Sequence, residues 1–206
     1  MAPLFAVAGL VLSLAQPVTA AAIDAPPPGS ITVNVVTVNG SGCRPGTATV
    51  AVSGDRKSFT VTYSEYLAKA GRGTTSTDRR KDCQLNLEVH VPEGHTYAIQ
   101  KVDYRGFASL TRGASGNLDA SYYFAGLSPT QQRGHRLTGP KSDNWQFTDQ
   151  SDIETMIYKP CGEDRNFNIK TALRANARQT AEQSFLSIDS TDVDFSSRYY
   201  FAWKRC

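Results

Sequence analysis

The sequence lacks the features that mark several large functional classes. It has no apolar run of about 20 residues, the length that a membrane-spanning helix needs. Its net charge is only +3, which is too small to indicate a nucleic-acid-binding protein. It also has no Gly-x-Ser-x-Gly elbow, no His-Glu-x-x-His pair and no phosphate-binding loop. We therefore expect no transmembrane anchor, no nucleic-acid partner and no cofactor, and we assign no catalytic residue.

The N-terminal segment has the pattern of a secretory signal peptide. Residues 4–14 are almost wholly apolar, and Pro17 and the small residues 18–22 follow them. An apolar run of about 11 residues before a small-residue stretch is typical of export signals, although no Lys or Arg precedes it. A buried N-terminal helix is the alternative. We expect a signal peptide at residues 1–20 and a secreted, extracellular protein.

The rest of the chain reads as one domain. Residues 21–30 form a Pro-rich lead-in, which Pro26, Pro27 and Pro28 would hold extended. No internal repeat and no mid-chain linker follows it. We therefore expect a single domain over residues 31–206 and a monomer.

The four cysteines are widely spaced, with no Cys-x-x-Cys pair that would suggest zinc. Since an exported chain meets an oxidising environment, two disulfides are expected. Three pairings are possible. We favour Cys43 with Cys83 and Cys161 with Cys206, because these pairs close the shortest loops.

Apolar and polar residues alternate with a period of two along most of the chain, which predicts half-buried β-strands. The clearest case is Leu85, Leu87 and Val89 against Gln84, Asn86 and Glu88. Strands are expected by this pattern at residues 31–35, 47–52, 58–63, 84–91, 167–174 and 199–203. Further strands are plausible at 97–110, 120–125, 153–158 and 184–189, and a short helix at 65–70.

Clusters of Gly, Pro, Ser and Asp separate these segments, among them residues 39–42, 53–55, 113–117 and 138–144. Short strands divided by turns indicate an all-β fold. We expect a disulfide-stabilised antiparallel β-sandwich, and a jelly-roll-like arrangement is compatible with this pattern.

Metal sites are weakly indicated. His90 and His95 flank a turn, but a metal would need a third ligand from elsewhere. Asp189, Asp192 and Asp194 could supply oxygen ligands to calcium, but the pattern lacks the central Gly and terminal Glu of an EF-hand. Solvated histidines and an ordinary acidic turn are the simpler interpretation, so no metal is expected.

Two surface features have alternative explanations. Asn39-Gly40-Ser41 matches the N-glycosylation acceptor pattern, although Asn-Gly is also a common turn pair. Arg79-Arg80 could be a processing site, although a solvated loop within residues 69–82 is the favoured interpretation.

Tyrosine doublets suggest a binding surface. Tyr122-Tyr123 and Tyr199-Tyr200 each lie in a predicted strand, where neighbouring side chains point to opposite faces. One ring of each doublet should therefore point outward and offer a platform for sugar rings or protein partners. We take Tyr122, Tyr123 and Tyr200 as candidate binding residues.

Seven motifs spread over the chain resemble one family. They are Pro-Pro-Pro-Gly-Ser at 26–30, Val-Asn-Gly-Ser-Gly-Cys at 38–43, Phe-Thr-Val-Thr-Tyr-Ser-Glu-Tyr at 59–66, Cys-Gln-Leu-Asn-Leu at 83–87, Val-Asp-Tyr-Arg-Gly at 102–106, Pro-Cys-Gly-Glu-Asp-Arg-Asn-Phe-Asn-Ile at 160–169 and Phe-Ala-Trp-Lys-Arg-Cys at 201–206. The set resembles the secreted proteins grouped as domain of unknown function 4360. This resemblance implies export, a compact domain and disulfide bonding, and it carries no known activity. Tyr104, Arg105, Glu163 and Arg165 are polar positions within these motifs, and we add them to the candidate binding residues.

The sequence thus favours a non-catalytic extracellular protein that binds a glycan or a protein surface. The alternative is a secreted hydrolase whose carboxylates converge only in the fold. A structural or defensive secreted protein without a small ligand is a third hypothesis.

Overall fold

The computed structural model describes residues 23–188 and 196–206. The predicted signal peptide and the proposed calcium ligands Asp189, Asp192 and Asp194 lie outside the described residues. Within those residues, no helix is long and apolar enough to cross a membrane.

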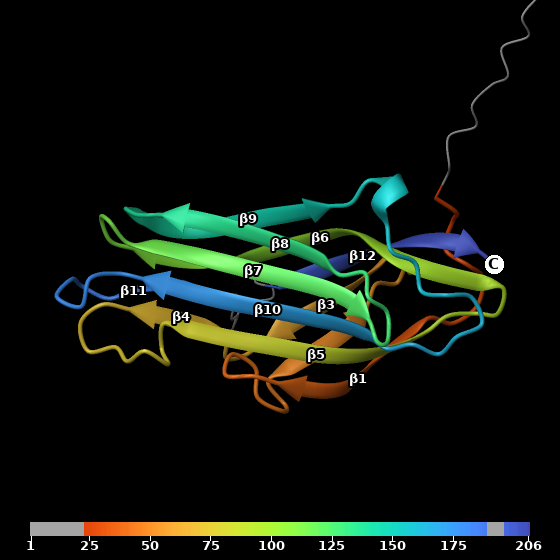
Figure 1. Ribbon diagram of the computed structural model, residues 1–206, viewed down its shortest axis with the longest axis horizontal. Coiled ribbons are helices and arrows are strands. Elements are labelled where there is room, and N and C mark those ends of the chain that lie inside the picture. The colour runs from red at the N-terminus through yellow and green to blue at the C-terminus, as the bar shows by residue number, and fades with distance from the viewer. Residues whose placement is uncertain (1–22, 189–195) are drawn as a thin grey trace, which may run out of the picture.

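Two antiparallel sheets stack face to face, and the five-stranded sheet faces the viewer in Figure 1. Its strands are, in spatial order, β1 (Thr32–Asn39), β5 (Arg80–His90), β10 (Phe167–Asn176), β7 (Ser115–Phe124) and β8 (Gln131–Thr138). The seven-stranded sheet has the order β2 (Ala48–Val52), β3 (Ser58–Tyr63), β12 (Ser197–Arg205), β6 (His95–Leu110), β11 (Ser184–Ser187) and β4 (Leu67–Ala70), and β9 (Lys141–Gln150) pairs with β6. The predicted all-β sandwich is confirmed.

The period-two pattern explains why these segments form strands. In β10, Phe167, Ile169 and Leu173 are buried between the sheets, whereas Lys170 and Arg174 face solvent. Each such strand covers the core with one face and leaves the other face to water. The inner faces of both sheets meet in one hydrophobic core.

The core is rich in aromatic side chains. Its largest fully buried members are Trp203, Tyr63, Tyr66, Tyr97, Tyr104, Tyr199, Phe59 and Phe124. Several rings stack or meet edge to face, as Phe59 and Tyr199 do with ring centroids 4.9 Å apart. Burial raises the pKa of the Tyr97 hydroxyl far above its ordinary value, so this group stays neutral.

Buried polar contacts join the two sheets. The hydroxyl of Tyr66, which directly precedes β4, donates to Thr171 Oγ1 of β10 at 2.9 Å. At the edge of the sandwich formed by β8 and β9, Tyr122 of β7 donates to Asp149 Oδ2 of β9 at 3.0 Å. The other oxygen of that carboxylate lies 2.6 Å from His135 Nε2 of β8. These contacts fix the position of the sheets more narrowly than apolar packing alone would.

Some sequence expectations were wrong. The predicted helix at residues 65–70 is replaced by the strand β4, because Leu67 pairs with Ser187 and Ala70 with Ser184 in β11. This tertiary pairing overrides the local helical preference. The predicted strand at residues 153–158 begins instead as a short 3-10 turn, in which Ile153 is 44% exposed.

The edge strands β8 and β9 were not predicted. Only Leu137 among the eight residues of β8 is aliphatic, and the alternation of its burial is shallow. Part of the turn expected at residues 138–144 belongs to β9, and part of that at 113–117 belongs to β7. The basic stretch at 69–82 is likewise not a single loop, because Lys69 lies in β4 and Arg80 begins β5.

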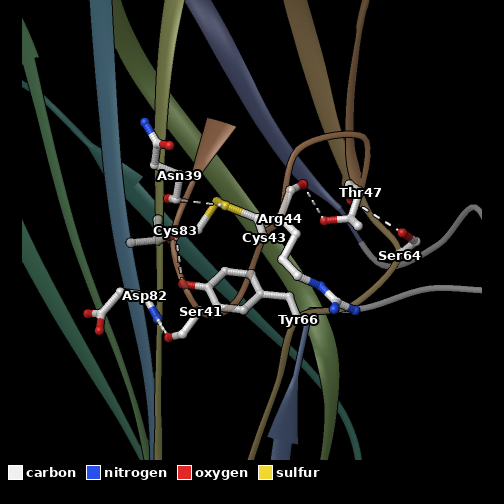
Figure 2. Close-up of a disulfide and its surroundings, with 10 residues drawn as sticks. Asn39, Ser41, Cys43, Arg44, Thr47, Ser64, Tyr66, Asp82 and Cys83 are labelled. Carbon is white, nitrogen blue, oxygen red and sulfur yellow. Dashed lines mark hydrogen bonds between the residues drawn. A yellow bond between two sulfur atoms is a disulfide. The ribbon is translucent and has the colours of Figure 1, made fainter. Parts of the chain in front are cut away.

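The disulfides pair as loop length predicted. Cys43, in the loop after β1, joins Cys83 of β5 with 5.2 Å between the Cα atoms (Figure 2). Cys161 joins Cys206, which follows β12, with 5.8 Å between the Cα atoms. The first pair is buried and the second is exposed.

We expect the two disulfides to differ in their access to reductant. Under native conditions, graded dithiothreitol should open Cys161–Cys206 before Cys43–Cys83, because thiolate attack requires access to sulfur. Alkylation of the freed thiols followed by peptide mass spectrometry measures the order. Release of Cys83 at or before the concentration that releases Cys161 would contradict this expectation.

The Tyr66–Thr171 hydrogen bond should contribute measurably to stability. We expect Tyr66→Phe to lower the free energy of unfolding by about 1–2 kcal/mol, because Thr171 loses a buried partner. Tyr97→Phe is the matched control, since the equally buried Tyr97 hydroxyl has no partner among the described residues. Urea unfolding of both variants tests this, and an equal loss in both would refute it.

Candidate binding site on the five-stranded sheet

The outer face of the five-stranded sheet contains an open depression of about 830 Å³, which we call the outer hollow. Strands β5, β10, β7 and β8 form its floor, and Asn39 and Gly40 at the end of β1 form its rim. The floor is low because three of its residues, Ala172, Ser121 and Gly134, have a short side chain or none. Residues with longer side chains surround these three.

Strand register arranges the outward side chains in rows across the sheet. One row runs through the polar residues Asn39, Gln84, Lys170, Ser121 and Gln132. The next row contains Asp82 and Asp119 on either side of Ala172. The rows thus place amides, an ammonium group and two carboxylates around a small-residue floor.

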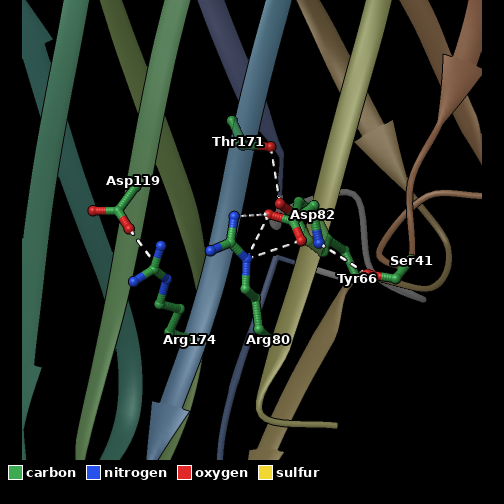
Figure 3. Close-up of polar contacts among 7 residues, drawn as sticks. All are labelled: Ser41, Tyr66, Arg80, Asp82, Asp119, Thr171 and Arg174. Atoms are coloured by element: carbon green, nitrogen blue, oxygen red, sulfur yellow. Dashed lines mark hydrogen bonds and ion pairs between the residues drawn. The ribbon is translucent and has the colours of Figure 1, made fainter. Parts of the chain in front are cut away.

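Two ion pairs border this floor (Figure 3). Arg80 donates to Asp82 from Nη2 at 2.7 Å and from Nε at 2.9 Å. Arg174 Nε lies 3.6 Å from Asp119 Oδ2. The hydrogen bonds to Asp82 raise the pKa of Arg80 above its ordinary value, so the guanidinium group stays charged. The side chains of all four residues are between 44% and 52% exposed, so they remain accessible to a ligand.

The rim beside Asp82 is held by backbone contacts. Gly42 N–H donates to the Asp82 carbonyl at 2.8 Å, and Asp82 N–H donates to Ser41 Oγ at 3.1 Å. Gly40 has φ +140°, and a Cβ there would lie 2.1 Å from the Asp82 carbonyl oxygen. Only glycine allows this approach of the loop to β5. The neighbouring Cys43–Cys83 disulfide holds the same loop to the same strand.

An aromatic ring lies on the same face of the sheet, next to the lining residues of the outer hollow. Tyr123 follows Ser121 on the outward side of β7, and the Lys170 ammonium lies 5.4 Å from the centre of its ring. Lys170 forms no ion pair within residues 23–188 and 196–206, where the structure is described. Next to Tyr123 in register, Asn168 accepts a hydrogen bond from Asn86 at 2.9 Å.

The predicted binding residues lie in several places. Tyr123 is on the same face of the sheet as the outer hollow, beside its lining residue Lys170. Asn39, the predicted glycosylation acceptor, is exposed at the rim. Arg105 and Tyr200 lie on the outer face of the other sheet, where Arg105 donates to Gln146 at 3.2 Å and Tyr200 lies under the Lys101 ammonium. These two residues therefore cannot act together with Tyr123.

Two further candidates hold a loop. Arg165 forms an ion pair with Glu163, and its Nη1 donates to the Ala125 carbonyl at 2.8 Å. These contacts connect the segment before β10 with the turn after β7.

Two candidates were wrong. Tyr104 and Tyr122 are 0% and 3% exposed, so they cannot contact a ligand at the surface. Both side chains point into the core, and in the second doublet the outward ring is Tyr200 rather than Tyr199.

No group of three or more metal-ligating side chains occurs in the described part of the chain. His95 contacts the Glu93 carbonyl at 3.1 Å, and His90 is exposed at the end of β5. The two histidines have no third ligand beside them in this part of the structure.

Sequence reasoning missed most of the outer hollow. Arg80, Asp82, Asp119, Lys170 and Arg174 come from three strands, and nothing local marks them as neighbours. Lys170 and Arg174 lay at outward positions of a predicted strand, whereas Arg80 and Asp82 lay in the stretch expected as a loop at 69–82 and Asp119 lay just before the strand expected at 120–125. Because antiparallel partners can be far apart in sequence, outward placement indicates a site only when the strand order is known.

Comparison with models of known protein families shows which family the chain belongs to. The model described as "Domain of unknown function (DUF4360)" matches residues 29–206. The chain belongs to this family. Among curated proteins, an uncharacterized secreted protein of Arthroderma benhamiae is 31% identical over 183 residues, which is 89% of this chain and 75% of that protein. This DUF4360 protein is therefore a secreted protein, as the sequence predicted.

One solved structure is similar to this DUF4360 chain at low sequence identity. It is the carbohydrate-binding module TmCBM61 in complex with β-1,4-galactotriose, at 14% identity, 85% coverage of this chain, 88% coverage of that chain and a TM-score of 0.27. At this TM-score we draw nothing from the likeness about ligand or site.

The ion pairs of the outer hollow should contribute little to the stability of this DUF4360 fold. We expect Asp82→Ala and Asp119→Ala each to change the free energy of unfolding by less than about 1 kcal/mol, because both pairs are solvent-exposed. By contrast, Asp149→Ala should cost about 2 kcal/mol or more, since it leaves Tyr122 and His135 without their buried partner. Chemical denaturation tests this, and an Asp82 or Asp119 variant as unstable as the Asp149 variant would show that the surface pairs are structural.

Proposed function

We propose that this secreted protein binds a glycan chain in the outer hollow. The observation that carries the proposal is the depression of about 830 Å³ on a sheet face, with a small-residue floor and oriented polar side chains around it. This volume is in the range of ligand sites in proteins. The depression is open and extends over four strands, or about 14 Å at the usual strand spacing, which suits a segment of a chain.

The polar groups fit a ligand rich in hydroxyl groups. Gln84, Gln132 and Asn39 offer amides that both donate and accept hydrogen bonds. The carboxylates of Asp82 and Asp119 are acceptors, and the guanidinium groups beside them are donors. Ion pairing holds the two carboxylates and the two guanidinium groups in place, which lowers the entropic cost of binding.

Tyr123 adds a surface for stacking. Its ring lies on the same face as the amides and is partly exposed. A sugar ring can pack its apolar side on such an aromatic face while its hydroxyl groups contact polar neighbours. One aromatic ring beside a polar hollow supports a glycan over a purely apolar ligand.

We favour binding over hydrolysis. Asp82 and Asp119 are the two carboxylates that flank the floor, one strand on each side of Ala172. A glycoside hydrolase needs one carboxyl group that carries a proton and a second that is free to act as base or nucleophile. Here each carboxylate is engaged by an arginine, which is an arrangement for holding a ligand.

A bulky side chain at the floor should abolish binding without disturbing the core. Ala172 lies between Asp82 and Asp119 on the floor of the outer hollow, so the longer side chain of Ala172→Leu should obstruct the floor and reduce retention on the preferred polysaccharide by about tenfold or more. Ala51→Leu, at an exposed position on β2 of the other sheet, is the matched control and should bind like the wild type. A glycan array followed by polysaccharide pull-down with purified mature protein measures this. Equal retention of both variants would place binding elsewhere, and no retention of the wild type on any polysaccharide would refute the proposal.

A further inference from the structure

We propose that the glycan bound in the outer hollow is acidic and belongs to the uronic acid class. Its carboxylate groups would contact a line of arginines at one end of the hollow. This inference rests on the proposed function, because it names the chemical class of the ligand of the same site.

The first observation is an opposed pair of arginines. Arg80 of β5 and Arg174 of β10 are direct register partners on the outer face. Like charges placed directly opposite each other on neighbouring strands are destabilising. Each arginine is therefore held by a separate carboxylate, Arg80 by Asp82 and Arg174 by Asp119. The two guanidinium groups remain about half exposed, which leaves N–H groups free for an anion.

The second observation is that a third arginine continues the same line. In register order across four strands the line consists of Arg80, Arg174, Asn117 and Arg136, which we call the arginine row. Arg136 is exposed on β8, just beyond the residues that line the outer hollow, and forms no ion pair with any residue that the structure describes. The row extends about 14 Å across the sheet at the usual strand spacing. Repeated cations along a line match a ligand with repeated anions.

The third observation is the balance of charge around the floor. Lys170 is also unpaired among the described residues, and it lies on β10 on the other side of Ala172 from Arg174. The residues that line the outer hollow include four cations, Arg80, Arg133, Lys170 and Arg174, and two carboxylates, Asp82 and Asp119, which leaves two positive charges there. A neutral glycan would leave these charges without partners, whereas uronate groups would neutralise them.

The chemistry of the cations favours carboxylates. A guanidinium group donates two parallel hydrogen bonds to a planar carboxylate, as Arg80 already does to Asp82 from Nη2 to Oδ1 and from Nε to Oδ2. Such a contact depends on the position of the arginine, whereas attraction to an anionic membrane or a nucleic acid depends mainly on overall charge. Single arginine variants on different faces can therefore separate these cases.

The test compares two ligands that share a backbone. Binding of the purified protein to polygalacturonate and to its fully methyl-esterified form is measured by calorimetry at two salt concentrations. We expect binding to polygalacturonate to be at least about tenfold tighter than to the ester and to weaken with salt, because esterification removes the charge.

Arginine variants locate the contact. We expect Arg136→Gln and Arg174→Gln each to weaken binding to polygalacturonate by about tenfold or more, the effect of losing one charge-assisted hydrogen bond. Arg105→Gln removes the same charge from the outer face of the other sheet and should leave binding unchanged. Arg136 has no ion pair to lose, so its variant separates binding from folding, and thermal unfolding confirms that each variant is folded.

Each contrary result has a distinct meaning. Equal binding to the two forms, or binding to neutral polysaccharides alone, would overturn the acidic class and leave the proposed glycan function intact. An equal loss in Arg105→Gln would overturn the arginine row and indicate attraction by overall charge. No binding to any acidic or neutral polysaccharide would refute this inference and the proposed function together.

Discussion

The two-residue period of the central strand β10 is the constraint on which the rest of the structure depends. Its inward residues, such as Phe167, Ile169 and Leu173, fill the core, and its outward residues Lys170 and Arg174 border the outer hollow. Because both sets share one backbone, a shift of one residue would exchange core and surface. The packing of the core therefore determines the positions of the groups in the candidate site.

Other contacts make this platform stiff. Thr171 lies between Lys170 and Ala172 and accepts the buried hydrogen bond from Tyr66 on the facing sheet. Cys83 lies between Asp82 and Gln84 and is covalently tied to the loop at the rim. Thr171 and Cys83 both point inward, and each is the sequence neighbour of residues that line the outer hollow. A site supported in this way is already arranged before a ligand arrives, and it differs from sites on mobile loops.

The fold could be predicted from the sequence wherever one face of a strand is apolar. The alternation in residues 167–174 predicted β10 closely, and the alternation in residues 84–91 predicted β5 apart from its first four residues. Where apolar residues are scarce, as in β8, no pattern was visible, and at residues 65–70 a short local preference lost to pairing with β11. Export and the disulfide pairing followed from composition, spacing and loop length, which do not require knowledge of the strand order.

The candidate site could be predicted only in part. Tyr123 was found because alternation within one strand places one ring of a doublet outward. The choice of Tyr122 as a second binding residue was wrong for the same reason, since its neighbour already occupied the outer face. Arg80, Asp119 and Lys170 come together through strand pairing between distant segments, and a single sequence without strand order does not contain that information.

The order of strands in the two sheets has a consequence for how an exported chain matures. Each sheet has at its centre a strand that comes late in the sequence, β10 between β5 and β7, and β12 between β3 and β6. Early segments emerging from a translocation channel thus have apolar faces whose partners have not yet appeared. Contacts so distant in sequence form slowly, so the sandwich closes only after nearly all of the chain has crossed. During that interval the chain depends on its many Ser, Thr and charged residues, and on any chaperone at the exit, to stay unaggregated.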